Sequence, residues 1–277
     1  MSISRITATG RSIDPNYPTN RAIALLALAV IVGGSVLQLI AGVQLVPSIS
    51  WGISAGLAVF LAWALARELD PDHDLSAFVA AGLTLIALFF FDLPGLTVLF
   101  WMIILLRIVN RTVGLPATIL DSLLILGLGS WLTLQGNWVY GLMTALALLM
   151  DSQLSPPHRR HLPFAGIALL VTVMLFFFGS MSRESELSIP VVVTALVMAA
   201  LFVPVIFASR ELTTVSDQTS ELLNPRRVQA AQGIALLTGI LMAWWNGYPG
   251  LASFMPVWAA MVGISLCRLF VLFSKRT

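Results

Sequence analysis

Ten long apolar runs constrain this sequence more than any other feature. They span residues 22–46, 47–66, 75–91, 93–109, 115–134, 137–150, 162–179, 188–208, 228–245 and 250–273. A helix rises about 1.5 Å per residue, so about 20 residues cross the roughly 30 Å of hydrocarbon in a bilayer. The runs are continuous, whereas the strands of a membrane barrel alternate apolar and polar residues. The sequence therefore predicts an all-α fold, a polytopic integral membrane bundle of about ten transmembrane helices.

The composition supports a chain whose surface mostly faces lipid. Of its 277 residues, 58% are hydrophobic and only 10% are charged, whereas soluble domains average about 25% charged residues. The formal net charge is only +2, and the basic residues are spread thinly along the chain. There is no basic face and no nucleic-acid motif, so we exclude nucleic acid as a partner. The expected partner is the lipid bilayer, together with a small molecule or a lipid.

The basic residues predict the orientation of the bundle, because short cytoplasmic loops of membrane proteins are rich in Lys and Arg. With the N-terminus inside and ten crossings, 14 of the 15 basic residues become cytoplasmic. These are Arg5, Arg11, Arg21, Arg67, Arg107, Arg111, Arg159, Arg160, Arg210, Arg226, Arg227, Arg268, Lys275 and Arg276. Only Arg183 is expected outside. We therefore expect a protein of the bacterial cytoplasmic membrane with both termini in the cytoplasm.

An internal duplication is indicated by landmarks that recur in the same order. Residues 67–69 and 210–212 both read Arg-Glu-Leu, and residues 94–96 and 249–251 both read Pro-Gly-Leu. The other matching landmarks are Gly82 with Gly233, Trp101 with Trp258 and Arg107 with Arg268. Two spacings between landmarks differ by 4 residues between the copies, which is close to one helical turn. Both copies begin on the cytoplasmic side, so the repeat is parallel, with an axis along the membrane normal.

The predicted domain organisation follows from this duplication. Residues 1–21 form a cytoplasmic N-terminal segment, and residues 22–110 form the first four-helix repeat. Residues 111–151 form a central helical hairpin, and residues 152–277 form the second four-helix repeat with the cytoplasmic C-terminus. The five-plus-five inverted repeat of ten-helix drug and metabolite transporters does not match this pattern.

Acidic loops at equivalent places in the two repeats are a candidate site for a divalent metal or a diphosphate. Their carboxylates are Glu68, Asp70, Asp72 and Asp74 in the first loop and Asp217 and Glu221 in the second. Hard oxygen ligands suit Mg²⁺, which is the cofactor we expect if these loops form a site. The alternative is structural, because Asp72 or Asp74 can cap the third helix and face the positive end of its dipole.

The arrangement of these loops resembles that of the aromatic prenyltransferases of membranes. In that family, Asp-rich motifs lie in two cytoplasmic loops of a duplicated helical bundle, where Mg²⁺ holds a diphosphate. The resemblance implies an enzyme that acts on a lipid or isoprenoid diphosphate at the cytoplasmic face. The Asn-Asp-x-x-Asp motif of that family is absent from this sequence, and the second loop holds few aspartates.

Three charges inside the apolar runs form the other candidate site, namely Arg107, Asp121 and Arg268. An unpaired charge near the membrane centre costs about 2.5–3.5 kcal/mol on insertion scales. Arg107 and Asp121 occupy consecutive antiparallel runs at a similar depth, so we predict that they form an ion pair in a cytoplasm-facing recess. The pair is either a structural salt bridge or part of a cavity with a transport or catalytic role.

A further polar segment follows the short sixth run. Asp151 and residues 158–161, which read His-Arg-Arg-His, could bind an anionic lipid headgroup. An ordinary cytoplasmic loop has the same composition, and two histidines without further His or Cys partners do not indicate zinc. The sequence contains no Gly-rich phosphate loop and no Gly-x-Ser-x-Gly elbow. It therefore assigns no catalytic residue.

Three functions remain open on these grounds. The leading hypothesis is a small permease or transport component, suggested by the duplication and by the charges on the cytoplasmic side. The first alternative is a membrane-embedded enzyme acting on a lipid or isoprenoid diphosphate at the cytoplasmic face. The second is a non-catalytic scaffold or assembly subunit of a membrane complex. Polar groups at mid-depth are sparse in the runs, which weakens transport and favours a scaffold.

Overall fold

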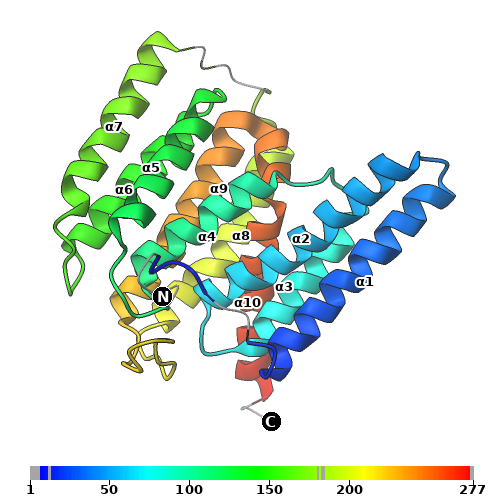
Figure 1. Ribbon diagram of the computed structural model, residues 1–277, viewed down its shortest axis with the longest axis horizontal. Helices are drawn as coiled ribbons and strands as arrows, with labels where there is room; N and C mark the ends of the chain where they lie inside the picture. The colour runs from blue at the N-terminus through cyan, green and yellow to red at the C-terminus, as the bar shows by residue number, and fades with distance from the viewer. Residues whose placement is uncertain (1–6, 12–13, 180, 182–184, 275–277) are drawn as a thin grey trace. The chain divides into compact units, whose positions relative to one another are not determined.

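The protein is built of helices (Figure 1). The computed structural model describes residues 7–11, 14–179, 181 and 185–274, without the side chains of residues 272–274. Within these residues there are ten helices and no strand beyond one isolated bridge between Val215 and Leu222. The helices are α1 (Pro18–Ile40), α2 (Leu45–Leu69), α3 (Asp74–Ala87), α4 (Leu96–Asn110), α5 (Ile119–Leu134), α6 (Trp138–Gln153), α7 (His161–Phe178), α8 (Ile189–Ala208), α9 (Pro225–Ser253) and α10 (Met255–Ser274).

Every predicted run overlaps one of these helices, which confirms the all-helical class. Five of them, α1, α2, α7, α8 and α9, are long and apolar enough to cross a membrane. Three others, α3, α4 and α5, are apolar but shorter, as is Met255–Val271, the part of α10 whose side chains are described. The count of ten crossings therefore stays a prediction. Arg5, Arg183, Lys275 and Arg276, which entered the orientation argument, lie outside the described residues.

The predicted break between the last two runs, at residues 246–249, contains a kink. The span of α9 extends to Ser253, but its helical backbone is interrupted at Gly247. The backbone of Gly247 has φ 61° and ψ −134°, a conformation that glycine adopts without steric cost. α9 begins at Pro225, three residues before the predicted run, and the side-chain oxygen of Asn224 accepts a hydrogen bond from the Arg226 amide at 3.0 Å.

The chain divides into two compact units. Unit 1 combines the described part of Met1–Arg11 with Trp101–Leu251, and unit 2 combines that of Ser12–Phe100 with Ala252–Thr277. Unit 1 therefore holds most of α4, the helices α5–α8 and nearly all of α9, whereas unit 2 holds α1–α3 and α10. These boundaries differ from those of the predicted repeats, and the duplication itself stays a prediction.

In unit 2, α1 and α2 pack through small residues. A Cβ added to Gly52 would lie 2.4 Å from the Ile31 carbonyl oxygen and 2.2 Å from the Ser35 hydroxyl. Only glycine at position 52 allows the two helices to approach so closely. α10 packs against α3 in a similar way, because a Cβ on Gly263 would lie 2.9 Å from the Ala80 nitrogen.

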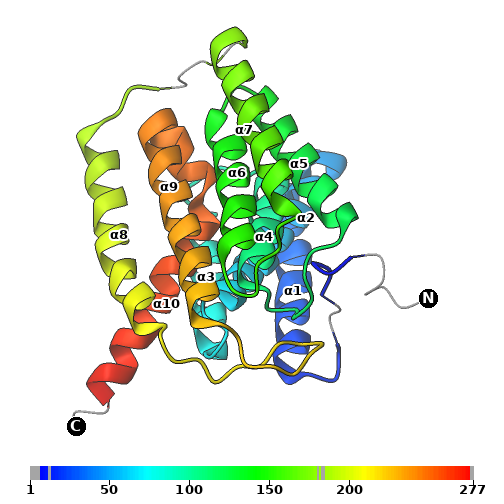
Figure 2. The same ribbon diagram turned by 90° about the vertical axis from the view of Figure 1, so that its left-hand side faces the viewer.

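In unit 1, helices α5, α6 and α7 lie side by side (Figure 2). Gly141 of α6 faces both neighbours, since a Cβ there would lie 2.1 Å from the Thr172 hydroxyl of α7 and 2.7 Å from that of Thr133 of α5. The indole of the fully buried Trp101 donates a hydrogen bond to the Thr144 hydroxyl at 3.0 Å and so joins α4 to α6. These contacts fix the helices that carry the polar cluster described below.

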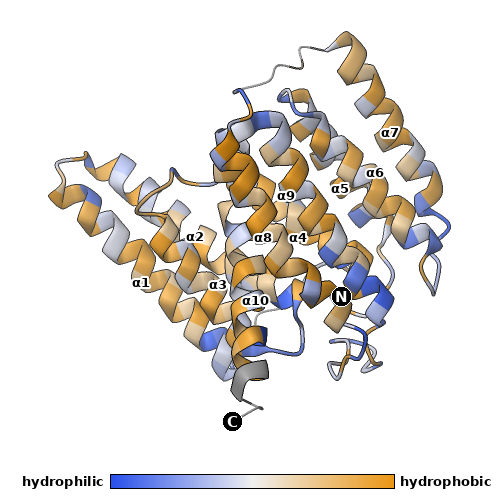
Figure 3. Ribbon diagram, turned by 180° about the vertical axis from the view of Figure 1, so that it is seen from behind, coloured by the Kyte–Doolittle hydropathy of each residue, from blue (hydrophilic) through white to orange (hydrophobic). Residues whose placement is uncertain are grey.

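Hydrophobic residues make up most of the helices, as the hydropathy colouring in Figure 3 shows, and many large apolar side chains are exposed. Leu25 of α1, Leu170 of α7 and Leu196 of α8 are 65%, 62% and 60% exposed. Soluble proteins rarely expose apolar surface on this scale. The exposed leucines are therefore suited to contact with lipid chains.

Candidate functional site

The first acidic loop is occupied by ion pairs. The Asp70 carboxylate is fully buried, and its Oδ1 lies 2.8 Å from the Arg268 guanidinium and 3.0 Å from Nδ1 of His73. Asp74 pairs with Arg67. The residue before α3 is His73, which makes no side-chain capping bond, so the predicted cap by Asp72 is wrong. Asp74 does lie in the first turn of α3, where a carboxylate faces the positive end of the helix dipole.

The second acidic loop belongs to the other compact unit. Asp217 belongs to unit 1 and accepts two contacts from Arg11, at 2.8 and 2.9 Å. Glu221 is exposed, Glu68 is buried and Asp72 is half-buried. Among the described residues, no three His, Cys, Asp or Glu side chains are grouped so that they could hold a metal ion. The expected Mg²⁺ site thus gains no support from these loops.

Asp121 lies at the amino end of α5 and is buried under the N-terminal segment. Its carboxylate accepts hydrogen bonds from the Ala8 amide at 2.8 Å, from the Thr9 hydroxyl at 2.8 Å and from the Thr7 hydroxyl. It also accepts from the amide and hydroxyl of Thr118, at 2.8 and 2.9 Å, and these two residues form a capping box. Asp121 is therefore stabilised by neutral donors.

Arg107 reaches the same segment from α4, since its guanidinium donates to the Thr9 carbonyl oxygen at 3.0 Å. Arg107 and Asp121 are thus connected through Thr9. This differs from the predicted direct ion pair, which is not among the contacts of Asp121 in the described residues. The sequence argument placed both residues at one end of the bundle but could not include a segment from the N-terminus.

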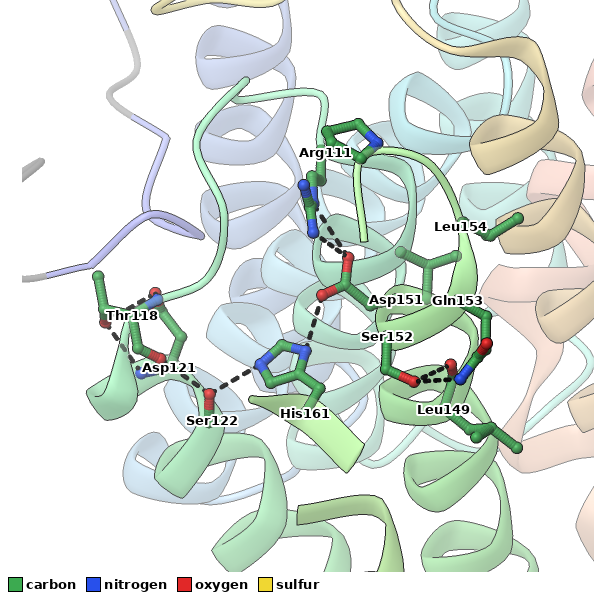
Figure 4. Close-up of polar contacts among 12 residues, drawn as sticks. Arg111, Thr118, Asp121, Ser122, Leu149, Asp151, Ser152, Gln153, Leu154 and His161 are labelled. Carbon is green, nitrogen blue, oxygen red and sulfur yellow. Dashed lines mark hydrogen bonds and ion pairs between the residues drawn. The ribbon is translucent and has the colours of Figure 1, made fainter. Parts of the chain in front are cut away.

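The densest polar cluster of unit 1 surrounds Asp151, near the end of α6 (Figure 4). Its fully buried carboxylate has Oδ1 at 2.7 Å from the Arg227 guanidinium and at 2.8 Å from that of Arg111. Its Oδ2 lies 2.8 Å from Nδ1 of His161, the first residue of α7. Arg111 follows α4 and has a left-handed backbone with φ 55°. Three helices, α4, α7 and α9, thus supply or position the partners of one buried charge on α6.

Arg227, at the start of α9, has an architectural role. Its NH1 donates to Asp151 and to the Val109 carbonyl at 2.9 Å. The carbonyls of residues 154–156 accept its other bonds, two from NH2 at 2.7 Å and one from Nε at 3.1 Å. A guanidinium has five N–H donors, and here all five are engaged. This side chain is therefore saturated by the fold and has no donor left for a ligand.

His161 connects Asp151 to a serine of α5. Its Nε2 lies 2.8 Å from the Ser122 hydroxyl, while its Nδ1 faces Asp151. With its proton on Nδ1, the imidazole turns an N–H toward the carboxylate and leaves Nε2 as an acceptor for the Ser122 hydroxyl. The three residues lie on α5, α6 and α7 and form a continuous Ser–His–Asp chain (Figure 4). Ser122 and His161 are 2% and 0% exposed.

His158, in the loop before α7, covers this chain from one side. Its ring lies 4.6 Å from the His161 ring, centroid to centroid. Burial, followed by the neighbouring His161, lowers the pKa of His158 below the ordinary 6.5. His158 is therefore held as a neutral imidazole near pH 7, which limits the positive charge at the cluster.

Sequence reasoning found only part of this cluster. It singled out Asp151 and residues 158–161, but as a headgroup site, and it counted Arg111 and Arg227 only as topological charges. It did not consider Ser122, which stands 39 residues before His161. No local spacing links residues on three helices. The only signal in the sequence was that Asp151, Arg111 and Arg227 all lie next to loops predicted to be cytoplasmic.

The described residues thus form an all-helical protein in which five helices are long and apolar enough to cross a membrane and a buried Ser–His–Asp chain joins α5, α6 and α7. No protein-family model matches the chain, and no curated protein or solved structure is significantly similar to it. Its function is therefore inferred from the geometry.

Proposed function

We propose that this protein is a membrane-embedded enzyme that transfers or hydrolyses the acyl group of a lipid ester at the cytoplasmic face. The observation that carries the proposal is the chain of two 2.8 Å contacts, from Ser122 to Nε2 of His161 and from Nδ1 of His161 to Asp151. A hydroxyl, an imidazole and a carboxylate in this order are the groups that acyl transfer through a serine requires.

The roles follow from the atoms that face each other. The Ser122 oxygen attacks the ester carbonyl carbon, and Nε2 of His161 accepts the hydroxyl proton. The same proton then passes to the departing alcohol oxygen, which leaves an acyl group on Ser122. Water, or a second alcohol, then attacks the acyl carbon while His161 takes its proton, the bond from the acyl group to the Ser122 oxygen breaks, and the proton returns from His161 to that oxygen. With water the sum is an ester and water giving an acid and an alcohol, and with a second alcohol it is the exchange of one ester for another.

The Ser122 hydroxyl has one hydrogen and two acceptors within reach. It donates to the Thr118 carbonyl at 2.9 Å, one turn back on α5, and it lies 2.8 Å from His161. Rotation about the Cα–Cβ bond moves the hydrogen between these acceptors. The bond to Thr118 is the resting arrangement of many helical serines, and the bond to His161 is the one that activates the oxygen.

Asp151 differs from the acid of an isolated triad, because two guanidinium groups share its charge. Arg111 and Arg227 both contact Oδ1, which leaves Oδ2 for His161. The arginines fix the position of the carboxylate, and the carboxylate fixes the ring of His161. We therefore assign to Asp151 the orientation of the ring more than the stabilisation of an imidazolium ion.

The surroundings of Ser122 favour a lipid substrate. Ile119, Leu120 and Leu123 on the same helix are 56%, 53% and 53% exposed, and Leu162 beside His161 is 51% exposed. Apolar side chains thus lie on the accessible sides of α5 and α7, the helices that carry Ser122 and His161. Since Ser122 and His161 are themselves buried, an ester reaches the hydroxyl only when the first turns of α5 and α7 separate.

Hydrolysis of esters by the purified full-length protein tests the proposal. We expect turnover of a fluorogenic acyl ester in lipid nanodiscs, with release of the free acid. Ser122→Ala and His161→Gln should each reduce the rate about 100-fold or more, which is the usual contribution of such groups. Ser152→Ala is the matched control, because Ser152 is also buried but donates to the Leu149 carbonyl. Equal rates for wild type and Ser122→Ala would exclude Ser122 as the nucleophile.

A permease is the second candidate, favoured by the composition of the two units. Each unit combines three helices of one predicted repeat with the fourth helix of the other, since α10 joins α1–α3 and α4 joins α7–α9. A duplicated transporter whose halves exchange one helix would give this grouping. Uptake of a solute by proteoliposomes that survives Ser122→Ala would favour the permease over the enzyme.

A further inference from the structure

We infer that Arg107, Asp121 and Asp217 form a peptide-binding site, which the protein's own residues 7–11 occupy as a detachable latch. The latch reads Thr-Ala-Thr-Gly-Arg. It belongs to unit 1, whereas the helix that follows it, α1, belongs to unit 2. The site residues come from α4, α5 and the loop before α9, so the latch joins three elements distant in sequence.

Asp121 recognises the first half of the latch. Both its oxygens are used, because Oδ1 accepts from the hydroxyls of Thr7 and Thr9 and Oδ2 accepts from the Ala8 amide at 2.8 Å. The Thr9 amide in turn donates to the Thr7 hydroxyl at 3.2 Å, which closes a tight turn. A Thr-x-Thr turn therefore presents three donors to one carboxylate.

Two charged side chains, Arg107 and Asp217, bind the second half of the latch. Arg107 donates to the Thr9 carbonyl at 3.0 Å. Arg11 then contacts both oxygens of Asp217, at 2.8 and 2.9 Å. The loop that carries Asp217 is itself held against the end of α4, because the Asp217 amide donates to the Thr112 carbonyl at 3.1 Å. Five residues of the latch thus offer the Arg11 guanidinium, the Thr9 carbonyl oxygen and three hydrogen-bond donors, and each of these groups contacts a complementary group of the site.

These contacts are polar, and the latch has no large apolar side chain to anchor it. Detachment would expose Asp121 and the freed donors to water, which replaces the lost hydrogen bonds, and segments held by few apolar contacts open locally at low cost. The Arg11–Asp217 pair is about one-third exposed on both sides. The latch is therefore specific in its docking and reversible in its attachment.

Detachment would uncover the amino end of α5. Asp121 directly precedes Ser122, and the latch covers the turn from which the Ser122 hydroxyl is presented. If the proposed enzyme function holds, the docked latch restrains the separation of α5 that admits an ester. The regulatory consequence rests on that function, but the binding site itself does not.

Cysteine accessibility in the full chain measures the docking without any assay of activity. The reporter is Ala8→Cys in a Cys267→Ser background, because Ala8 is 4% exposed, and the rate of maleimide labelling is recorded in nanodiscs. We expect slow labelling in this background and at least tenfold faster labelling when Asp121→Asn is added. Thr7→Ala with Thr9→Ala should accelerate labelling to a similar degree. Asp14→Asn is the matched control, since Asp14 bonds only within its own turn in the described contacts.

Equal labelling rates with and without Asp121→Asn would overturn the binding site. The rate at which Ser122 reacts with a fluorophosphonate is the second readout. Asp121→Asn should increase this rate if detachment of the latch also opens the proposed active site. Faster maleimide labelling of the Ala8→Cys reporter without any reaction at Ser122 would retain the latch and reject the enzyme. Circular dichroism of each variant confirms that the helices persist.

Discussion

At the scale of single residues, Arg227 explains why the cluster around Asp151 is rigid. It is nearly fully buried, and its five donors serve one carboxylate and four backbone carbonyls. The carbonyls lie at the ends of α4 and α6, so one side chain joins the start of α9 to both helices. The planar guanidinium matches this set of acceptors, whereas an ammonium group does not.

We therefore expect Arg227→Lys to destabilise the protein although it keeps the charge. A lysine has three donors, so at least two buried acceptors lose their partner, at a total cost of about 2–4 kcal/mol. Thermal unfolding in detergent, followed by circular dichroism, measures the loss. Arg226→Lys is the control, because Arg226 is exposed and should tolerate the change. Equal stability of Arg227→Lys and wild type would refute the architectural role.

His158 makes the stability of the cluster depend on pH. Its pKa in the folded protein lies below 6.5, so the unfolded chain takes up a proton more readily than the folded one. Stability therefore rises with pH in this range and is lost as the pH falls below about 6.5. We expect the melting temperature to drop between pH 7.5 and pH 5.5, and to drop less in His158→Gln. An identical pH profile for the two proteins would contradict this assignment.

At the scale of elements, the contact of α6 with α5 and α7 positions Ser122, Asp151 and His161. Gly141 lies at the centre of this layer, with threonine hydroxyls of both neighbouring helices where its Cβ would be. Close helix packing of this kind depends on a small residue and on good van der Waals contact. The catalytic geometry we propose is thus a consequence of helix packing as much as of the polar residues.

Gly141→Ala should separate these helices and destabilise unit 1 by about 1–3 kcal/mol, the usual cost of overpacking a well-packed contact. Gly127→Ala is a close control on α5, since its Cβ would meet nothing within 4 Å. Alanine favours helices over glycine, so this control should be neutral or slightly stabilising. The test compares the unfolding midpoints of the two variants with that of the wild type. A Gly141→Ala midpoint equal to that of the wild type would mean that α5, α6 and α7 pack less tightly than described.

The sequence predicts the helices well and the site poorly, for a physical reason. Apolar runs are local, so the bounds of α8 and α5 differ from the predicted runs by only a few residues. The partners of Asp151 are not local, because Arg111, His161 and Arg227 approach it only after four helices have packed. The count of basic residues placed Arg111 and Arg227 on the cytoplasmic side, but it could not show that both contact Asp151.

At the scale of the whole molecule, helix length and charge predict the topology. Five helices are long and apolar enough to cross a membrane, and the distribution of basic residues predicts their orientation. Reporters fused after Asp92 and after Gly136 should report the outside, and those fused after Asp72 and after Arg160 should report the inside. A fusion after Glu184, outside the described residues, should also report the outside. One internal site on the wrong face would break the ten-crossing prediction.

The central claim is that Ser122 is activated by His161, and covalent labelling tests it most directly. The full-length protein in nanodiscs is treated with a lipophilic fluorophosphonate, and the modified residue is identified by mass spectrometry. The account predicts one adduct on Ser122 that disappears in His161→Gln, while the neighbouring Ser152 stays unmodified. An unmodified Ser122 under conditions that label a soluble serine hydrolase, or a Ser122 adduct that forms equally fast in His161→Gln, would contradict it.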